Sequence, residues 1–163
     1  MLNVVLRDVK NSDAPWIFDA CQDGEIQRWT KVPRPYLMEH AEGFCRGEGV
    51  EERYRWAIWE NDVTDVGLGL ISVHKIENHM AELGYWIAPW ARGLGVCTRA
   101  VDEVVAWLTD LNDVVAATAR IAETNSASQR VVTKAGFSVA GPTVDLLPDG
   151  DLKVPGLIFR REL

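Results

Sequence analysis

The sequence predicts a mixed α/β fold, also describable as α+β, in which helices cover both faces of a largely antiparallel sheet. Two observations support this prediction. Strand-like and helix-like segments alternate in the middle of the chain, and strand-like segments joined by short turns lie toward both ends. No internal repeat or low-complexity linker divides the 163 residues, so we expect a single domain over residues 1–163.

The N-terminal half consists of short periodic runs separated by turn-forming residues. Strands alternate every second residue, whereas the apolar positions of helices recur three or four residues apart. The capping residues Asn11, Ser12 and Asp13 precede the first helical run. The expected elements are a strand over 2–7, a helix over 14–23, an irregular or partly helical segment over 24–36, a helix over 37–47, and strands over 53–60, 66–75 and 82–87.

The C-terminal half adds two helices and three strands. Asn125 is placed to cap the second of these helices, and Gly136 followed by Phe137 is typical of a helix C-cap. The expected elements are a helix from about 95 to 108, a strand over 114–121, a helix over 125–134, and strands over 137–147 and 153–163 separated by a turn at 148–151.

The stretch from Glu82 to Leu108 reads as a strand, a glycine-rich turn and a helix. Pro89 closes the strand, and the helix begins near Gly95. The first turn of a helix carries N–H groups without partners, and the helix dipole makes that end electropositive. A turn of small residues at this point therefore predicts a backbone cradle for a phosphate.

Three motifs resemble the GNAT family of N-acetyltransferases, in the branch that contains the ribosomal-protein N-terminal (RimJ/RimL-like) acetyltransferases. The pyrophosphate loop of that family reads Gln/Arg-x-x-Gly-x-Gly/Ala, and Cys97 is the one departure, at a position where the family prefers Gly or Ala. The matching residues are Arg92-Gly93-Leu94-Gly95-Val96-Cys97 in the loop, Gly84-Tyr85-Trp86-Ile87 in the strand, and Asn125-Ser126-Ala127-Ser128 with Lys134-Ala135-Gly136-Phe137 downstream.

The resemblance implies a sheet of about seven strands that splays open between the strand ending near Ile87 and the strand beginning near Val114. It also implies acetyl-CoA as co-substrate, with the pantetheine arm paired to strand backbone in that opening, and direct attack by the acceptor in a ternary complex. The residues that the resemblance assigns to the donor are Trp86, Ile87, Arg92, Gly93, Leu94, Gly95, Val96, Cys97, Thr98, Asn125 and Ser128.

Acetyl transfer from a thioester to an amine needs a neutral amine, a hydrogen-bond donor for the developing oxyanion and a proton for the departing thiolate. The resemblance implies that N–H groups near Ile87 are the oxyanion donors. It also implies that Ser128, one helical turn after Asn125, is the acid for the thiolate. The competing interpretation is that Asn125 and Ser128 form an ordinary helix N-terminus.

The predicted strand over 82–87 places Glu82, Gly84 and Trp86 on one face, so that Gly84 leaves space for an amine between a carboxylate and an indole. We expect Glu82 to be the base, acting directly or through water. His74 and Glu77 on the neighbouring strand are alternatives, although either could be an ordinary surface residue.

The resemblance implies that the segment over 24–36 forms part of the wall of the acceptor site. Trp29 and Tyr36 could line a substrate pocket there or simply pack the segment onto the sheet. A peptide α-amine is favoured over a lysine side chain, because its reference pKa of about 8, against about 10.4, suits a modest base. A small-molecule amine or antibiotic acetyltransferase is the alternative.

Two further function classes fit the sequence less well. A dinucleotide-binding protein would need Gly-x-Gly-x-x-Gly, but Gly93 and Gly95 are followed by Thr98 where the third glycine should stand. A non-catalytic acyl-CoA sensor would keep the phosphate loop without needing Glu82 or Ser128. The presence of both residues favours an enzyme.

Composition supports the same class. The net charge of −7 disfavours a nucleic-acid partner and suits a cationic amine. Cys21, Cys45 and Cys97 are too widely spaced for a zinc site or a disulfide framework, so we expect buried thiols and no metal. No run predicts a membrane span or a secretory signal, which favours a cytoplasmic protein. The sequence is compatible with a monomer or a homodimer.

Overall fold

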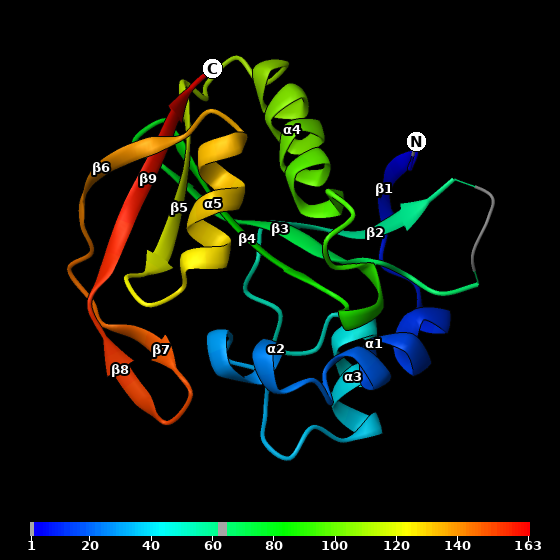
Figure 1. Ribbon diagram of the computed structural model, residues 1–163. Helices are drawn as coiled ribbons and strands as arrows, with labels where there is room; N and C mark the ends of the chain where they lie inside the picture. The colour runs from blue at the N-terminus through cyan, green and yellow to red at the C-terminus, as the bar shows by residue number, and fades with distance from the viewer. Residues whose placement is uncertain (1, 62–64) are drawn as a thin grey trace.

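The computed structural model describes residues 2–61 and 65–163, and among these residues seven strands form one sheet in the order β1-β2-β3-β4-β5-β9-β6 (Figure 1). Its strands are β1 (Val4–Asp8), β2 (Tyr54–Glu60), β3 (Gly69–Glu77), β4 (Met80–Ile87), β5 (Ala116–Ala122), β6 (Ser138–Pro142) and β9 (Gly156–Glu162). A separate hairpin is formed by β7 (Leu147–Asp149) and β8 (Leu152–Val154). The predicted sheet of about seven strands is confirmed.

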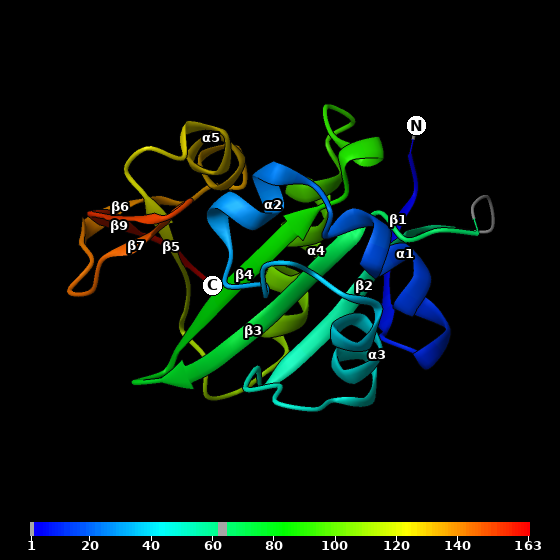
Figure 2. The same cartoon turned by 90° about the horizontal axis from the view of Figure 1, so that it is seen from below.

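Helices cover both faces of this sheet, as predicted. Figures 1 and 2 show α1, α2 and α3 on one face, over β2, β3 and β4, with α4 and α5 on the other. The helices are α1 (Ala14–Ala20), α2 (Gly24–Trp29), α3 (Met38–Arg46), α4 (Val96–Thr109) and α5 (Ser126–Lys134), and two 3₁₀ helices, Asn11–Asp13 and Pro89–Ala91, precede α1 and α4. Each face has its own buried apolar cluster, one under α4 and α5 and the other under α1 and α3.

β4 and β5 are parallel neighbours, whereas the other adjacent strands of the sheet pair antiparallel. Residues 80–83 of β4 pair with residues 116–119 of β5. Beyond that point β5 stays paired with β9, and residues 84–87 of β4 stay paired with β3. The sheet therefore opens between β4 and β5, which confirms the predicted splay (Figure 2).

The first helix is shorter than predicted. It ends at Ala20 rather than near Asp23, because Asp23 is the N-cap of the next helix and its carboxylate accepts the N–H of Ile26 at 3.0 Å. The segment over 24–36 is partly helical, as expected, since α2 occupies its first six residues. β3 begins at Gly69 rather than at 66 and extends to Glu77.

The two long C-terminal strands were wrongly predicted. The run over 137–147 contributes only β6 to the main sheet, because the pairing with β9 shifts between Val139 and Gly141 and the strand ends at Pro142, which has no N–H for a ladder. Pro155 separates β8 from β9 in the same way. The turn predicted at 148–151 is present, but it closes the β7–β8 hairpin.

The capping predictions for the central and C-terminal helices hold. α4 begins at Val96 after Gly95, and α5 begins after Asn125, whose side chain accepts the N–H of Ser128 at 3.2 Å. Gly136 has φ of +82°, and the N–H of Phe137 returns to the carbonyl of Val132 at 2.9 Å.

Asp13 is a buried carboxylate that fastens α1 to β1. It accepts hydrogen bonds from both terminal nitrogens of Arg7 at 2.9 and 2.7 Å, from the backbone of Lys10 at 2.8 Å and from the indole of Trp16 at 2.8 Å. Burial raises the pKa of Asp13, but these hydrogen bonds outweigh burial and hold the pKa below its ordinary value. The three cysteines are buried, as predicted, and no helix among the described residues is long and apolar enough to cross a membrane.

Candidate functional site

The predicted phosphate cradle lies at an exposed, left-handed turn before α4. Gly93 and Gly95 both have φ of +75°, a conformation that side chains disfavour, and a Cβ at either position would meet only open space. No side chain in the described part of the chain caps the N-terminus of α4. The first N–H groups of this 14-residue helix are therefore available to an anion.

The side chains of the loop do not face a common ligand. Arg92 is held by Asp23, with N···O distances of 3.2 and 2.5 Å, which links the loop to the start of α2. Val96 and Cys97 are buried, and burial raises the pKa of the Cys97 thiol. Leu94 is exposed. A phosphate at this turn would thus meet backbone, and Cys97 preserves the loop's shape as the family's small residue would.

The opening in the sheet exposes one edge of β4. The N–H of Ala88 bonds to the carbonyl of Leu68 on the β3 side at 2.9 Å. Peptide groups of a strand alternate between its two edges, so the N–H of Ile87 faces the opening. This orientation is the one that the predicted oxyanion role of Ile87 requires.

Ser128 lies at the opening with a partner that the sequence did not suggest. Its Oγ is 2.7 Å from the hydroxyl of Tyr85, which extends from β4 toward the first turn of α5. Tyr85 is enclosed, and burial raises the pKa of its phenol. The hydrogen bond depends on how α5 packs against the sheet, and the residue pattern of the strand carries no signal for that packing.

Glu82 lies on the opposite face of β4 in an ion-pair chain. Its Oε1 is 2.6 Å from Nε of Arg120 on β5, and Arg120 is also 3.9 Å from a carboxylate oxygen of Asp145. The Glu82 side chain is 11% exposed. Arg120 therefore fixes the carboxylate beside the place where β4 and β5 separate.

The space predicted above Gly84 is filled, which corrects the expected amine pocket. The register of β3 against β4 shifts at His74, and this bulge directs the imidazole over Gly84. A Cβ at Gly84 would lie 2.2 Å from His74 Nε2, so only glycine fits beneath the ring. Nδ1 of the same ring is 4.0 Å from Oε2 of Glu82.

The other predicted residues lie apart from this group. Glu77 is exposed at the end of β3 and pairs with Lys75 at 3.0 Å. Tyr36 is buried in the cluster under α1 and α3, which favours the packing interpretation. Trp29 is half-buried at the end of α2, where its indole donates to Glu25 at 3.0 Å, and its substrate role stays a prediction.

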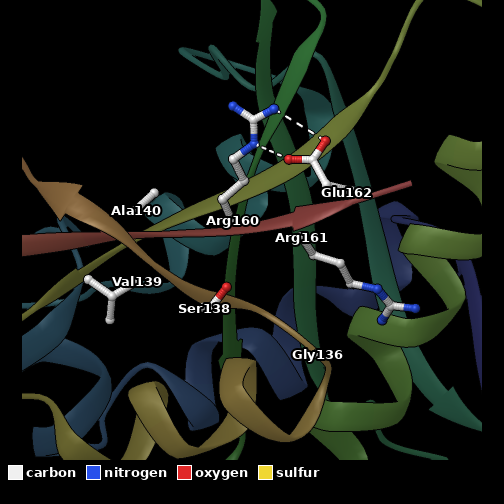
Figure 3. Close-up of a pocket in the computed structure, with 7 residues that line it drawn as sticks. All are labelled: Gly136, Ser138, Val139, Ala140, Arg160, Arg161 and Glu162. Carbon is white, nitrogen blue, oxygen red and sulfur yellow. Dashed lines mark hydrogen bonds and ion pairs between the residues drawn. The ribbon is translucent and has the colours of Figure 1, made fainter.

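A surface cavity of about 470 Å³ lies elsewhere, along β6 and β9 (Figure 3). Figure 3 shows Arg160 and Glu162 on one side of β9 and Arg161 on the other. Nε of Arg160 is 2.6 Å from Glu162, and Arg161 is 3.1 Å from Asp102, so these charges are already engaged. The cavity contains none of the predicted site residues.

Comparison with known proteins points to one family. A family model described as an acetyltransferase (GNAT) domain matches residues 3–138. A curated relative, the uncharacterized N-acetyltransferase YoaA of Bacillus subtilis (strain 168), is 25% identical over 144 residues, which cover 85% of this chain and 81% of that protein.

Solved structures share the whole fold at low sequence identity. The microcin C7 self-immunity acetyltransferase MccE, in complex with acetyl-CoA and AMP, has a TM-score of 0.85 at 14% identity, with 99% of this chain and 93% of that chain covered. RimL, a ribosomal alpha-N-protein acetyltransferase in complex with coenzyme A, has a TM-score of 0.83 at 18% identity, with 99% of this chain and 94% of that chain covered. Spermidine N-acetyltransferase from Vibrio cholerae, in complex with CoA and spermine, has a TM-score of 0.81 at 15% identity, with 98% of this chain and 95% of that chain covered.

Proposed function

Because this chain belongs to the GNAT family of acetyltransferases, we propose that it transfers the acetyl group of acetyl-CoA to the α-amino group of a protein or peptide. The observation that carries the proposal is the opening between β4 and β5. Ser128 and Tyr85 border it on one face of the sheet, and Glu82 and His74 lie at its other face. An amine entering there meets groups suited to proton transfer on both sides.

The residues around the opening fit acetyl-CoA. The left-handed glycines before α4 expose backbone N–H groups to a diphosphate, whose negative charge the helix N-terminus favours. The edge of β4 over residues 84–87, which no strand of the described chain pairs on the β5 side, offers backbone groups to an extended amide-containing arm. When bound, acetyl-CoA supplies the acetyl group as a thioester.

This chain's own residues then provide the elements of acyl transfer. The N–H of Ile87 stabilises negative charge on the carbonyl oxygen, and Ser128, oriented by Tyr85, supplies a proton to the departing sulfur. The group formed by Glu82 and His74 removes a proton from the acceptor amine. Asn125 keeps Ser128 in the first turn of α5 by capping the helix.

The pairing of carboxylates with arginines favours a peptide over a polyamine. The carboxylates of Glu82, Asp23 and Asp149 are each within 2.6 Å of an arginine nitrogen. A polyamine carries several cations along its length and needs carboxylates whose charge is not already neutralised. A peptide N-terminus presents a single cation, followed by backbone that can hydrogen-bond.

Thiol release from acetyl-CoA tests this proposal. Short peptides with a free α-amine, the same peptides with a blocked N-terminus and a single lysine, spermidine, and acetyl-CoA alone form the panel. Release with the free α-amine peptides, confirmed by a mass increase of one acetyl group at the N-terminus, is the expected result. Release only with spermidine would replace the acceptor class, and binding of acetyl-CoA with no release for any amine would indicate a sensor.

A further inference from the structure

Three side chains from three adjacent strands converge beside the opening: His74 from β3, Glu82 from β4 and Arg120 from β5. The two oxygens of Glu82 face different partners. Oε1 is 2.6 Å from Arg120 Nε, and Oε2 is 4.0 Å from His74 Nδ1. Glu82 therefore stands between a guanidinium and an imidazole.

Access differs sharply between the two candidate proton acceptors. The Glu82 side chain is 11% exposed and already accepts a short charge-assisted bond. The His74 side chain is 44% exposed, and the β-bulge lays its ring over Gly84 on the strand that borders the opening. An acceptor, or a water bound to it, reaches the imidazole more easily than the carboxylate.

Resting on the proposed acetyl transfer, we propose that His74 is the catalytic base and that Glu82, anchored by Arg120, is the residue that positions it. Nδ1 is the ring nitrogen that faces Glu82, and the tautomer with its proton on Nδ1 has its lone pair on Nε2. Nε2 takes the first proton of the acceptor ammonium, directly or through one water, and releases it to solvent after the reaction.

The remaining steps of the transfer take place on the face of the sheet that carries Ser128. The nitrogen lone pair of the neutral amine forms the C–N bond as the C–S bond breaks, and the sulfur keeps the bonding pair. The amine nitrogen loses its second proton to the oxygen of Ser128, which replaces the proton that Ser128 gives to the sulfur. His74 is thus needed before bond formation and Ser128 during it.

The charges that face His74 come from several elements. Glu82 of β4 is closest, followed by Arg120 of β5, which is itself 3.9 Å from Asp145. On β3, Lys75 and Glu77 pair with each other at 3.0 Å. Within the described part of the chain, Glu82 is the carboxylate that pairs with the ring, at 4.0 Å, so a neutral substitution there tests positioning most directly.

Gly84 offers a way to move the imidazole without removing it. A methyl group at this position would lie 2.2 Å from Nε2, so the ring of His74 must shift in a Gly84→Ala protein. Gly84 has no left-handed backbone that would itself make alanine costly. The loss caused by Gly84→Ala should therefore depend on His74 being present.

The test compares pH–rate profiles for thiol release, with acetyl-CoA and a short peptide bearing a free N-terminal serine. His74→Gln should lower kcat by about 100-fold and abolish the acid limb, with coenzyme A affinity unchanged. Glu82→Gln should lower kcat by about tenfold and keep an acid limb. Gly84→Ala should cost roughly tenfold alone and almost nothing when added to His74→Gln. His79→Asn, at an exposed left-handed position, is the matched control and should behave as the parent.

Two more measurements separate a base from a structural histidine. Added imidazole should restore activity to His74→Ala, and the ring proton signals of His74, identified by their loss in His74→Gln, should change in Glu82→Gln but not in the control. Loss of the acid limb in Glu82→Gln with its retention in His74→Gln would overturn the proposal. Unchanged ring signals in Glu82→Gln would overturn the positioning role. If the parent acetylates no amine, the proposed function fails, and the ring signals still decide the contact.

Discussion

The hydroxyl groups of Tyr85 and Ser128 lie 2.7 Å apart, although 43 positions separate the two residues in the sequence. The hydrogen bond joins β4 to the first turn of α5 at the border of the opening. A phenol that donates to Ser128 Oγ leaves the serine proton free to point elsewhere. The pair therefore sets the direction in which Ser128 can donate.

Tyr85→Phe tests this orientation. The substitution keeps the buried ring and removes only the hydroxyl, so kcat should fall by about three- to tenfold while coenzyme A affinity stays within twofold of the parent, on the order of one hydrogen bond. Steady-state kinetics and calorimetry measure the two quantities. Tyr54→Phe removes a hydroxyl from the aromatic cluster with Trp56 and Trp107 and should leave kcat unchanged. If kcat is the same for Tyr85→Phe and Tyr54→Phe, Tyr85 has only a packing role.

Ser128→Ala should lower turnover by about tenfold or more, because the serine proton is needed mainly as the C–S bond breaks. Coenzyme A affinity should remain nearly intact. Ser126→Ala, at the exposed start of the same helix, is the control. Parental turnover by Ser128→Ala under conditions where chemistry limits the rate would remove this residue from the mechanism.

Gly95→Asp should weaken coenzyme A binding by about tenfold or more. The new side chain brings negative charge to the N-terminus of α4, and the φ of +75° disfavours any side chain. Gly49→Asp introduces the same side chain at another exposed left-handed glycine, φ +62°, and should not change binding. Calorimetry on folded variants checks both, and unchanged affinity in Gly95→Asp would misplace the cradle.

Asp13→Asn should destabilise the fold by about 3 kcal/mol at neutral pH, since it leaves Arg7 without its buried partner. The pKa of Asp13 is lowered in the folded protein, so its stabilising effect is complete above the unfolded pKa and is lost as pH falls through the lower folded pKa. Urea unfolding should therefore show the gap between parent and variant closing as pH falls below about 4. Asp19→Asn, exposed on α1, should track the parent, and a pH-independent gap would contradict the argument.

The parts of the site that depend on local sequence could be predicted. The left-handed glycines before α4 and the cap of α5 by Asn125 follow from residue types at neighbouring positions. The strand that ends at Ile87 could also be predicted from its own residues. These features need only a few consecutive residues to agree.

The contacts between distant segments could not be predicted in the same way. A two-residue alternation places Glu82 and Gly84 on one face but contains no signal for the bulge that places the His74 ring over Gly84. The length of the edge strand β6 was overestimated because hydrophobic alternation continues past Gly141, where the pairing with β9 shifts. Arg120 was missed because its importance comes from the carboxylate beside it.

Four residue pairs between β4 and β5 join the two parts of the sheet at one end. One part consists of β1 to β4, and the other consists of β5, β9 and β6. A ligand that bonds along residues 84–87 stands where the missing strand would be, so occupancy completes the sheet. Donor concentration should then act on folding itself, raising the melting temperature and slowing exchange of the Tyr85 and Ile87 amide hydrogens. Donor binding would thus stabilise the fold as well as supply the reaction.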